Sequence, residues 1–203
     1  MIPVTIPGIN DKLYAGFWSR LAAGFIDGLV WAPVLYGFEY IEGLNMYNFL
    51  YTHIIGILIA IFYDVYLVKK YGGTLGKLAM GIKIIRTDGF EVDWKESFNR
   101  YLVSFIISIS AIVLYFSAAS HISDEQFYAA DIWNRKDLMV KQAPMLNYWM
   151  FIYYAWFVSE FIVLLTNPRK RAIHDFIADT VVIKSKYHNH IKEYQMENDN
   201  ASQ

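Results

Sequence analysis

Four long apolar runs limit what this chain can fold into. They lie at about residues 17–40, 49–68, 101–120 and 148–166, and most charged residues lie between them. Each run has about the 20 mostly apolar residues that a helix needs to cross a hydrocarbon core of roughly 30 Å. The last three are apolar on nearly all sides, whereas a helix at the surface of a soluble protein keeps a polar face. The sequence therefore predicts an all-α membrane protein built as a four-transmembrane-helix bundle.

The distribution of lysine and arginine predicts the orientation of these spans. Of the 18 such residues, seven lie at 69–100 and six lie after residue 166, whereas none lies at 41–48. Cytoplasmic loops are enriched in Lys and Arg. We therefore expect a multi-pass protein of a cell membrane, with the 69–100 loop and both termini in the cytoplasm. The first residues, MIPVTIPGINDKLY, lack the basic and apolar regions of a cleavable signal peptide.

The connections between the spans show patterns of local structure. Three glycines precede an apolar and basic stretch around Leu75 and Leu78, which favours a short amphipathic helix at the membrane interface. The sequence KIIRT, then Asp88-Gly89, then FEVDW predicts a small cytoplasmic β-hairpin over 82–94. The run TVVIK, near residue 180, could add a strand to that hairpin.

The sequence also predicts the local structure of the C-terminal region. Asn-Pro followed by spaced apolar residues predicts a tail helix over 168–179. After it the chain becomes polar, so we expect a transmembrane domain over 1–186 and a disordered tail over 187–203.

Several kinds of chemistry are disfavoured by the composition. The chain has no cysteine, which excludes disulfides and Cys-based metal sites, and its net charge of −1 gives no sign of nucleic-acid binding. GGTLGKL differs from a phosphate-binding loop because Tyr71 and Leu78 stand where that loop needs glycine and Ser or Thr. The five histidines have no metal-ligand spacing, and there is no Gly-x-Ser-x-Gly. We expect no enzyme activity, no metal and no cofactor.

Ionisable residues inside the apolar runs are the main candidates for function. Asp27 lies near the middle of the first span, Asp64 toward the cytoplasmic end of the second, and Glu160 in the inner half of the fourth. Each costs about 2.5–3.5 kcal/mol at a helix centre, so such residues usually face protein or water. Together with His174 in the tail, they are the candidates for ion or proton binding, or for a polar network.

The first span also carries Arg20 and a pair of glycines. Arg20, Gly24, Asp27 and Gly28 are spaced by three and four residues and share one helical stripe. Gly24 and Gly28 form a small-xxx-small pair that lets a neighbouring helix approach, in the same molecule or in a second copy. Arg20 and Asp27 are roughly 10 Å apart along the axis, so each needs another partner.

The candidate partners differ for the two charged residues of this span. For Arg20 they are the carboxylates of Asp64, Asp175 and Asp179. For Asp27 we expect a polar cavity.

Three stretches carry a family resemblance: AGFWSRLAAGFIDGLVW, YGGTLGKLAMGIKIIRTDG and NPRKRAIHDFIADTVVI. The chain resembles the RDD family of bacterial membrane proteins, which is named for one arginine and two aspartates. Arg20, Asp27 and Asp175 match these three residues. The resemblance covers roughly residues 14–184, and the connection at 121–147 lies outside its pattern. It implies an integral membrane protein of unsettled role, in a family of which some members are linked to sodium–proton exchange.

Two hypotheses follow from these features. In the first, the protein is a small transporter in which Asp27 and Glu160 alternately bind a proton and a monovalent cation, and Arg20 keeps a neighbouring carboxylate ionised. Four spans are few for alternating access, and the sequence shows no internal repeat, so we expect a homo-oligomer or a membrane-protein partner. In the second, it is a non-transporting assembly, regulatory or immunity subunit, and the Arg20, Asp27 and Asp175 side chains form a structural latch.

Overall fold

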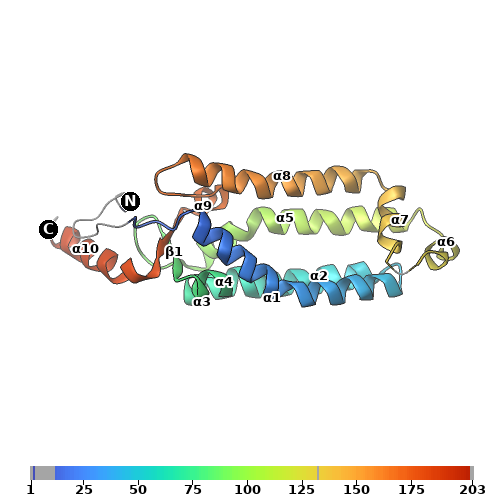
Figure 1. Ribbon diagram of the computed structural model, residues 1–203, viewed down its shortest axis with the longest axis horizontal. Helices are drawn as coiled ribbons and strands as arrows, with labels where there is room; N and C mark the ends of the chain where they lie inside the picture. The colour runs from blue at the N-terminus through green and yellow to red at the C-terminus, as the bar shows by residue number, and fades with distance from the viewer. Residues whose placement is uncertain (1, 3–11, 132, 202–203) are drawn as a thin grey trace. The chain divides into compact units, whose positions relative to one another are not determined.

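The computed structural model describes residues 2, 12–131 and 133–201. Four of its helices are long and apolar enough to cross a membrane: α1 (Phe17–Leu44), the continuous helix Asn48–Tyr71, α5 (Trp94–Ala119) and α8 (Met145–Thr166) (Figure 1). The second of these consists of α2 (Asn48–Ala60), a π-helical segment (Ile61–Tyr66) and α3 (Leu67–Tyr71). The predicted fold class, a membrane protein with four spans and a small β element, is confirmed.

The described residues also form shorter elements. These are α4 (Leu75–Ala79), β1 (Ile82–Arg86), α6 (Asp124–Ala129), α7 (Arg135–Gln142), α9 (Ile173–Ile177), β2 (Thr180–Lys184) and α10 (His188–Ala201). The chain divides into two compact units. The sheet unit contains Met1–Gly28, Ile61–Tyr101 and Ser159–Gln203, and the helical unit contains Leu29–Ala60 and Leu102–Val158.

The sheet unit is built on two antiparallel strands. β1 and β2 pair from Ile82 opposite Lys184 to Arg86 opposite Thr180. The chain just before α1 adds to β2, because Ala15 donates its backbone N–H to the carbonyl of Val182 at 2.9 Å. Successive strand residues point to opposite faces. One face therefore buries Ile85, Val181 and Ile183 beside Leu13 and Ile191, and the other buries Ile82, Ile84 and Val182 beside Ala15, Ala23 and Val68.

The expected hairpin at 82–94 forms only in part. The turn is present, with Gly89 at φ 95° and a hydrogen bond from Arg86 N to Phe90 O, but the returning segment makes a single bridge between Ile85 and Glu91. The strand that pairs along the whole of β1 is β2, whose buried β-branched side chains fill both faces.

Helix α5 begins at Trp94, seven residues before the expected start at 101. The backbone N–H of Asp93 donates to Glu96 Oε2 at 2.9 Å, and Ser97 N donates to Asp93 O at 3.0 Å. This Asp-x-x-Glu pattern stabilises a helix start, so it ends the returning hairpin segment and extends α5 by two turns.

The C-terminal region differs from the expectation at two places. The helix expected at 168–179 is limited to α9, because Lys170 has a left-handed φ of 51° and the Asn167 side chain binds the backbone N–H and C=O of Arg171. The tail that we expected to be disordered contains the helix α10. Ile191 is fully buried, and Tyr187 and Tyr194 pack against the same cluster. These three residues have helical spacing, and their burial stabilises a helix despite its polar composition.

The helical unit has its own apolar core. Its largest buried side chains are Phe49 on α2, Tyr115 on α5, Phe127 on α6 and Leu146 on α8. The connection at 121–147 folds into α6 and α7, and α6 starts with a capping box between Ser123 and Gln126. In the most apolar window of α1, only 6% of the residues are buried, and the share is the same in α8. Such low burial is expected for helices that face lipid.

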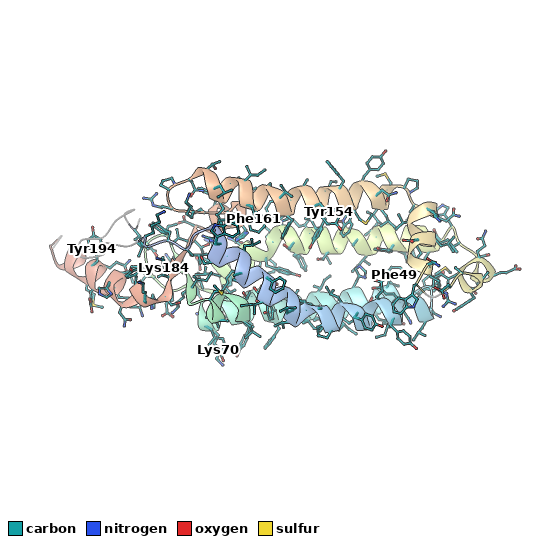
Figure 2. All side chains as sticks on the ribbon, in the orientation of Figure 1. Phe49, Lys70, Tyr154, Phe161, Lys184 and Tyr194 are labelled. Atoms are coloured by element: carbon teal, nitrogen blue, oxygen red, sulfur yellow. The ribbon has the colours of Figure 1, made fainter. Side chains whose placement is uncertain are left out.

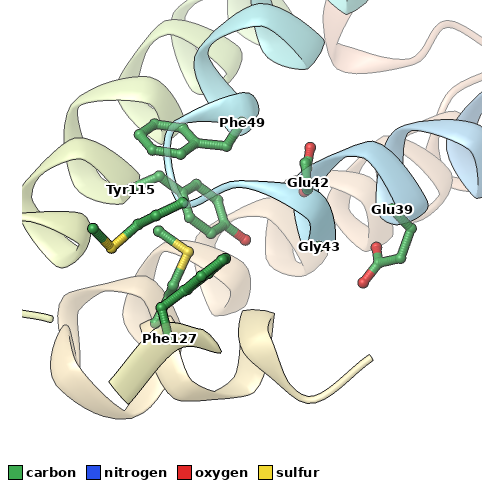
Figure 3. Close-up of a pocket in the computed structure, with 8 residues that line it drawn as sticks. Glu39, Glu42, Gly43, Phe49, Tyr115 and Phe127 are labelled. Carbon is green, nitrogen blue, oxygen red and sulfur yellow. The ribbon is translucent and has the colours of Figure 1, made fainter. Parts of the chain in front are cut away.

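A small pocket lies within this core. Figure 3 shows Glu39 and Glu42 of α1 on one side and Phe49, Tyr115 and Phe127 on the other. From its position at the end of the apolar run, Glu42 would be expected to be solvated. Instead its carboxylate accepts a 2.6 Å hydrogen bond from Thr52.

Candidate functional site

Asp175 is the centre of a buried ion-pair cluster in the sheet unit. Its side chain is 0% exposed, and its Oδ2 lies 2.7 Å from Arg20 Nη1. Arg100 Nη1 contacts the other oxygen, Oδ1, and the backbone N–H of Ala172 donates to Oδ2 at 2.9 Å. Burial would raise the pKa of the Asp175 carboxyl, but the charges of Arg100 and Arg20 hold it well below its usual range. Of the three candidate partners of Arg20, the structure selects Asp175.

Both arginines make further contacts that fix them in place. Arg20 donates through Nη2 to the carbonyl of Lys170 at 2.5 Å, and Arg100 donates to the hydroxyl of Thr180. The cluster therefore joins α1, α5, α9 and the start of β2. Sequence reasoning missed Arg100. The signal that could have found it is the early start of α5 at the Asp93 cap, which places Arg100 in the second turn of that helix.

Glu160 and His174 form a second pair beside this cluster. Glu160 Oε2 lies 2.5 Å from His174 Nδ1, and His174 Nε2 lies 3.7 Å from Asp175 Oδ1. Burial lowers the pKa of the His174 imidazole, and the nearby charge of Arg100 lowers it further, which favours the neutral ring.

Asp27 has direct donors on three sides rather than the expected polar cavity. Its Oδ1 accepts hydrogen bonds from Tyr63 Oη at 2.6 Å and from the backbone N–H of Gly76 at 2.7 Å. Its Oδ2 accepts one from Thr74 Oγ1 at 2.7 Å. Tyr63 lies on the π-helical segment, and the other two donors lie at the start of α4. Asp27 therefore ties α1 to both elements.

Gly76 is required for this tie. A Cβ at that position would lie 2.1 Å from the carbonyl oxygen of Ala23 and 2.7 Å from Asp27 Oδ1. The short sequence Thr74-Leu75-Gly76 therefore supplies a hydroxyl, an exposed apolar side chain and an unobstructed N–H. Gly24 and Gly28 behave differently, because a Cβ on either would meet no described atom within 4 Å. Within one molecule, the glycine pair is not a packing surface for the residues that the structure describes.

Asp64 differs from the other carboxylates of the spans. It lies on the π-helical segment, and no described residue forms a hydrogen bond or salt bridge with its side chain. The charges that act on it are those of Lys77, Asp27 and Arg100. π-helical turns inside α-helices are frequent at functional sites.

Lys77 is the nearby cation on α4. Its Nζ donates to Thr74 Oγ1 at 3.3 Å, so the residue that binds Asp27 also holds the lysine head group. Burial lowers the pKa of Lys77, and the like charge of Arg100 lowers it further, whereas Asp27 and Asp64 raise it. The charges of the Lys77 amine and the Asp64 carboxylate therefore act on each other.

The spans and the buried charges between them define an integral membrane protein. Its sequence places it more closely: the chain belongs to the RDD family, whose model matches residues 14–179. Two similar proteins come from Bacillus subtilis (strain 168). An uncharacterized protein, YxaI, is 29% identical over 124 residues, which cover 50% of this chain and 80% of YxaI. An uncharacterized membrane protein, YteJ, is 22% identical over 182 residues, which cover 85% of this chain and 82% of YteJ. No solved structure matches the chain.

The arginine and two aspartates that match the family name lie at two places in the sheet unit. Arg20 and Asp175 are direct partners, whereas Asp27 binds Tyr63, Thr74 and Gly76. Asp27 connects α1 to the second span and to α4, and the Arg20–Asp175 pair connects α1 to α9.

Proposed function

We propose that the protein exchanges a monovalent cation for a proton across the membrane, and that Asp64 is the carboxylate beside which the cation and the protonated Lys77 ammonium group compete. The observation that carries this proposal is that Asp64 lies in a span and that no described residue donates a hydrogen bond to its side chain. An ionisable side chain in a span is costly and usually marks an ion or proton pathway. Asp27 and Asp175, by contrast, already accept several hydrogen bonds each.

Lys77 gives this exchange a simple charge balance. When the lysine is protonated, its ammonium group compensates Asp64. When the ammonium releases its proton to water, a monovalent cation takes its place beside the carboxylate. The lowered pKa of Lys77, which follows from burial and from Arg100, makes that release easier. One charge replaces another, so the pair remains neutral in both states.

The two ties of α1 act as positioning contacts in this proposal. Asp27 binds Thr74 and Gly76 at the start of α4, and α4 carries Lys77. The Arg20–Asp175–Arg100 cluster fixes α5 and α9 against α1. Glu160, paired with His174, is the remaining span carboxylate through which a proton could pass.

We also propose that the sheet unit lies on the cytoplasmic side. The basic segment 69–100 and the basic C-terminal region both belong largely to it, in agreement with the positive-inside rule. Because four spans are few for alternating access, we expect that more than one copy forms the transport unit.

Proton flux in liposomes tests the exchange. We expect a Na⁺ gradient to drive a pH change inside liposomes that contain the wild-type protein, and Asp64→Asn to reduce it to the level of empty liposomes. Asp88→Asn is the matched control, because Asp88 lies in the partly exposed hairpin turn and pairs with Arg86. Melting temperatures should be the same for all three proteins. Wild-type flux equal to that of empty liposomes for Na⁺, Li⁺ and K⁺ would refute the proposal, and so would full flux in Asp64→Asn.

A second candidate function is a non-transporting membrane subunit. The observation that favours it is that all three family-motif side chains make structural contacts. In that case the wild-type protein would show no flux with any cation, while substitutions at Arg20, Asp27 and Asp175 would still destabilise it.

A further inference from the structure

Aromatic residues lie beside Lys70 at the end of the second span. The Nζ atom of Lys70 lies 3.0 Å from Tyr66 Oη and within 5.5 Å of the ring centres of Tyr66 and Tyr71. The ring of Trp94, which is 54% exposed, lies 6.3 Å from that of Tyr66. Figure 2 shows Lys70 pointing outward from the ribbon. We call Tyr66, Lys70, Tyr71 and Trp94 the Lys70 patch.

The Lys70 patch has hydrogen-bond donors that lack acceptors. Tyr66 Oη accepts from Lys70, but its own O–H has no acceptor among the residues that the structure describes, and neither has the indole N–H of Trp94. Lys70 adds a positive charge with three N–H donors. An ammonium, a hydroxyl and an indole N–H on one exposed surface are suited to the oxygen atoms of an anion.

Asp93, the carboxylate that precedes Trp94 in the sequence, is already engaged by another lysine. Asp93 Oδ1 lies 3.0 Å from Lys69 Nζ and accepts the backbone N–H of Trp94 at 2.8 Å. That N–H and the Lys69 ammonium hold the pKa of Asp93 below its usual value. Asp93 therefore neutralises Lys69, and the charge of Lys70 is left for another anion.

The surroundings indicate a lipid rather than a soluble anion. The patch continues directly into the exposed apolar surface of its span, where Phe62 stacks on Tyr66 at 5.2 Å and is 55% exposed. Tyr and Trp concentrate at the depth of lipid head groups, and lysine there attracts anionic lipids.

We propose that the Lys70 patch binds the head group of an anionic phospholipid. The phosphate lies against the Lys70 ammonium, Tyr66 and Trp94 donate to phosphate or glycerol oxygens, and the acyl chains run along Phe62. This site is separate from Asp64 and does not depend on the proposed exchange.

Lipid retention in native mass spectrometry tests the site. We expect the purified protein to retain phosphatidylglycerol in preference to phosphatidylcholine, and Lys70→Gln to bind phosphatidylglycerol about fivefold more weakly, the loss expected for one interfacial lysine. Lys70→Arg keeps the charge and should restore retention. Lys192→Gln is the control, because Lys192 is also partly exposed but pairs with Glu91 on the sheet unit.

Three outcomes would contradict the proposal that the Lys70 patch binds an anionic phospholipid. They are equal retention of the two lipids by the wild-type protein, unchanged retention in Lys70→Gln, and displacement of the lipid by soluble glycerol phosphate. The last result would assign the patch to a soluble anion.

Discussion

Asp175→Asn is expected to lower the free energy of unfolding by about 3–5 kcal/mol, the usual cost of removing one partner from a buried ion pair. The wild-type carboxylate lies between Arg20 and Arg100 and is fully buried. A neutral amide would remove the one carboxylate that contacts both guanidinium groups. Denaturant unfolding in detergent, followed by tryptophan fluorescence, measures the loss.

The control for this substitution is Asp179→Asn. Asp179 also pairs with an arginine, Arg171, at 3.3 Å, but its side chain is 73% exposed. Exposed pairs contribute about 0–1 kcal/mol, so this change should have little effect. Equal losses for the two variants would contradict the account of the cluster.

The same contacts predict how stability depends on pH. The pKa of folded Asp175 lies well below its usual range, so its contribution is complete above about pH 4, the ordinary value for an aspartate. This contribution to the free energy of unfolding is lost as the pH falls through the pKa of Asp175 in the folded protein. The difference in unfolding free energy between the wild-type protein and Asp175→Asn should therefore become smaller only in strong acid.

Gly76→Ala is expected to destabilise the protein by about 3 kcal/mol, at the upper end of the range for overpacked sites. The new methyl group would lie 2.1 Å from the Ala23 carbonyl, so α4 must move away from α1. This movement also removes two of the donors of Asp27, Gly76 N and Thr74 Oγ1. The same unfolding measurement applies, and proton flux should fall as well because Lys77 moves with α4.

Gly24→Ala is the matched control for Gly76→Ala. The substitution is chemically the same and lies on α1, yet its Cβ meets no described atom within 4 Å. Alanine favours a helix over glycine by about 0.5–1 kcal/mol, so stability should stay the same or rise. A loss as large as that of Gly76→Ala would show that the clash at Gly76 is not the cause.

Local patterns in the sequence predicted the spans because hydropathy over about 20 residues is sufficient to identify them. They also predicted Asp175 as a candidate partner of Arg20, although the two lie 155 positions apart. The donors of Asp27 were not predictable in this way. A carboxylate in a span needs a partner, but only the folded chain brings Tyr63, Thr74 and Gly76 to it.

Competition between long-range and local contacts explains the other differences. Asp88-Gly89 forms its turn, but β2 fills both faces of the sheet and pairs with the whole of β1. The polar composition of α10 suggested disorder, whereas the burial of Ile191 in the sheet unit stabilises the helix. In both cases the decisive side chains contact residues far away in the sequence.

Exchange at Asp64 is tested by the number of protons released when the purified protein binds Na⁺. Competition between the cation and the Lys77 proton predicts about one proton released per bound cation. Lys77→Gln should bind Na⁺ without releasing a proton. Asp64→Asn should neither bind Na⁺ nor release a proton. Calorimetry in two buffers of different ionisation enthalpy gives both numbers. Binding without proton release in the wild-type protein, or unchanged release in Asp64→Asn, would contradict exchange at Asp64.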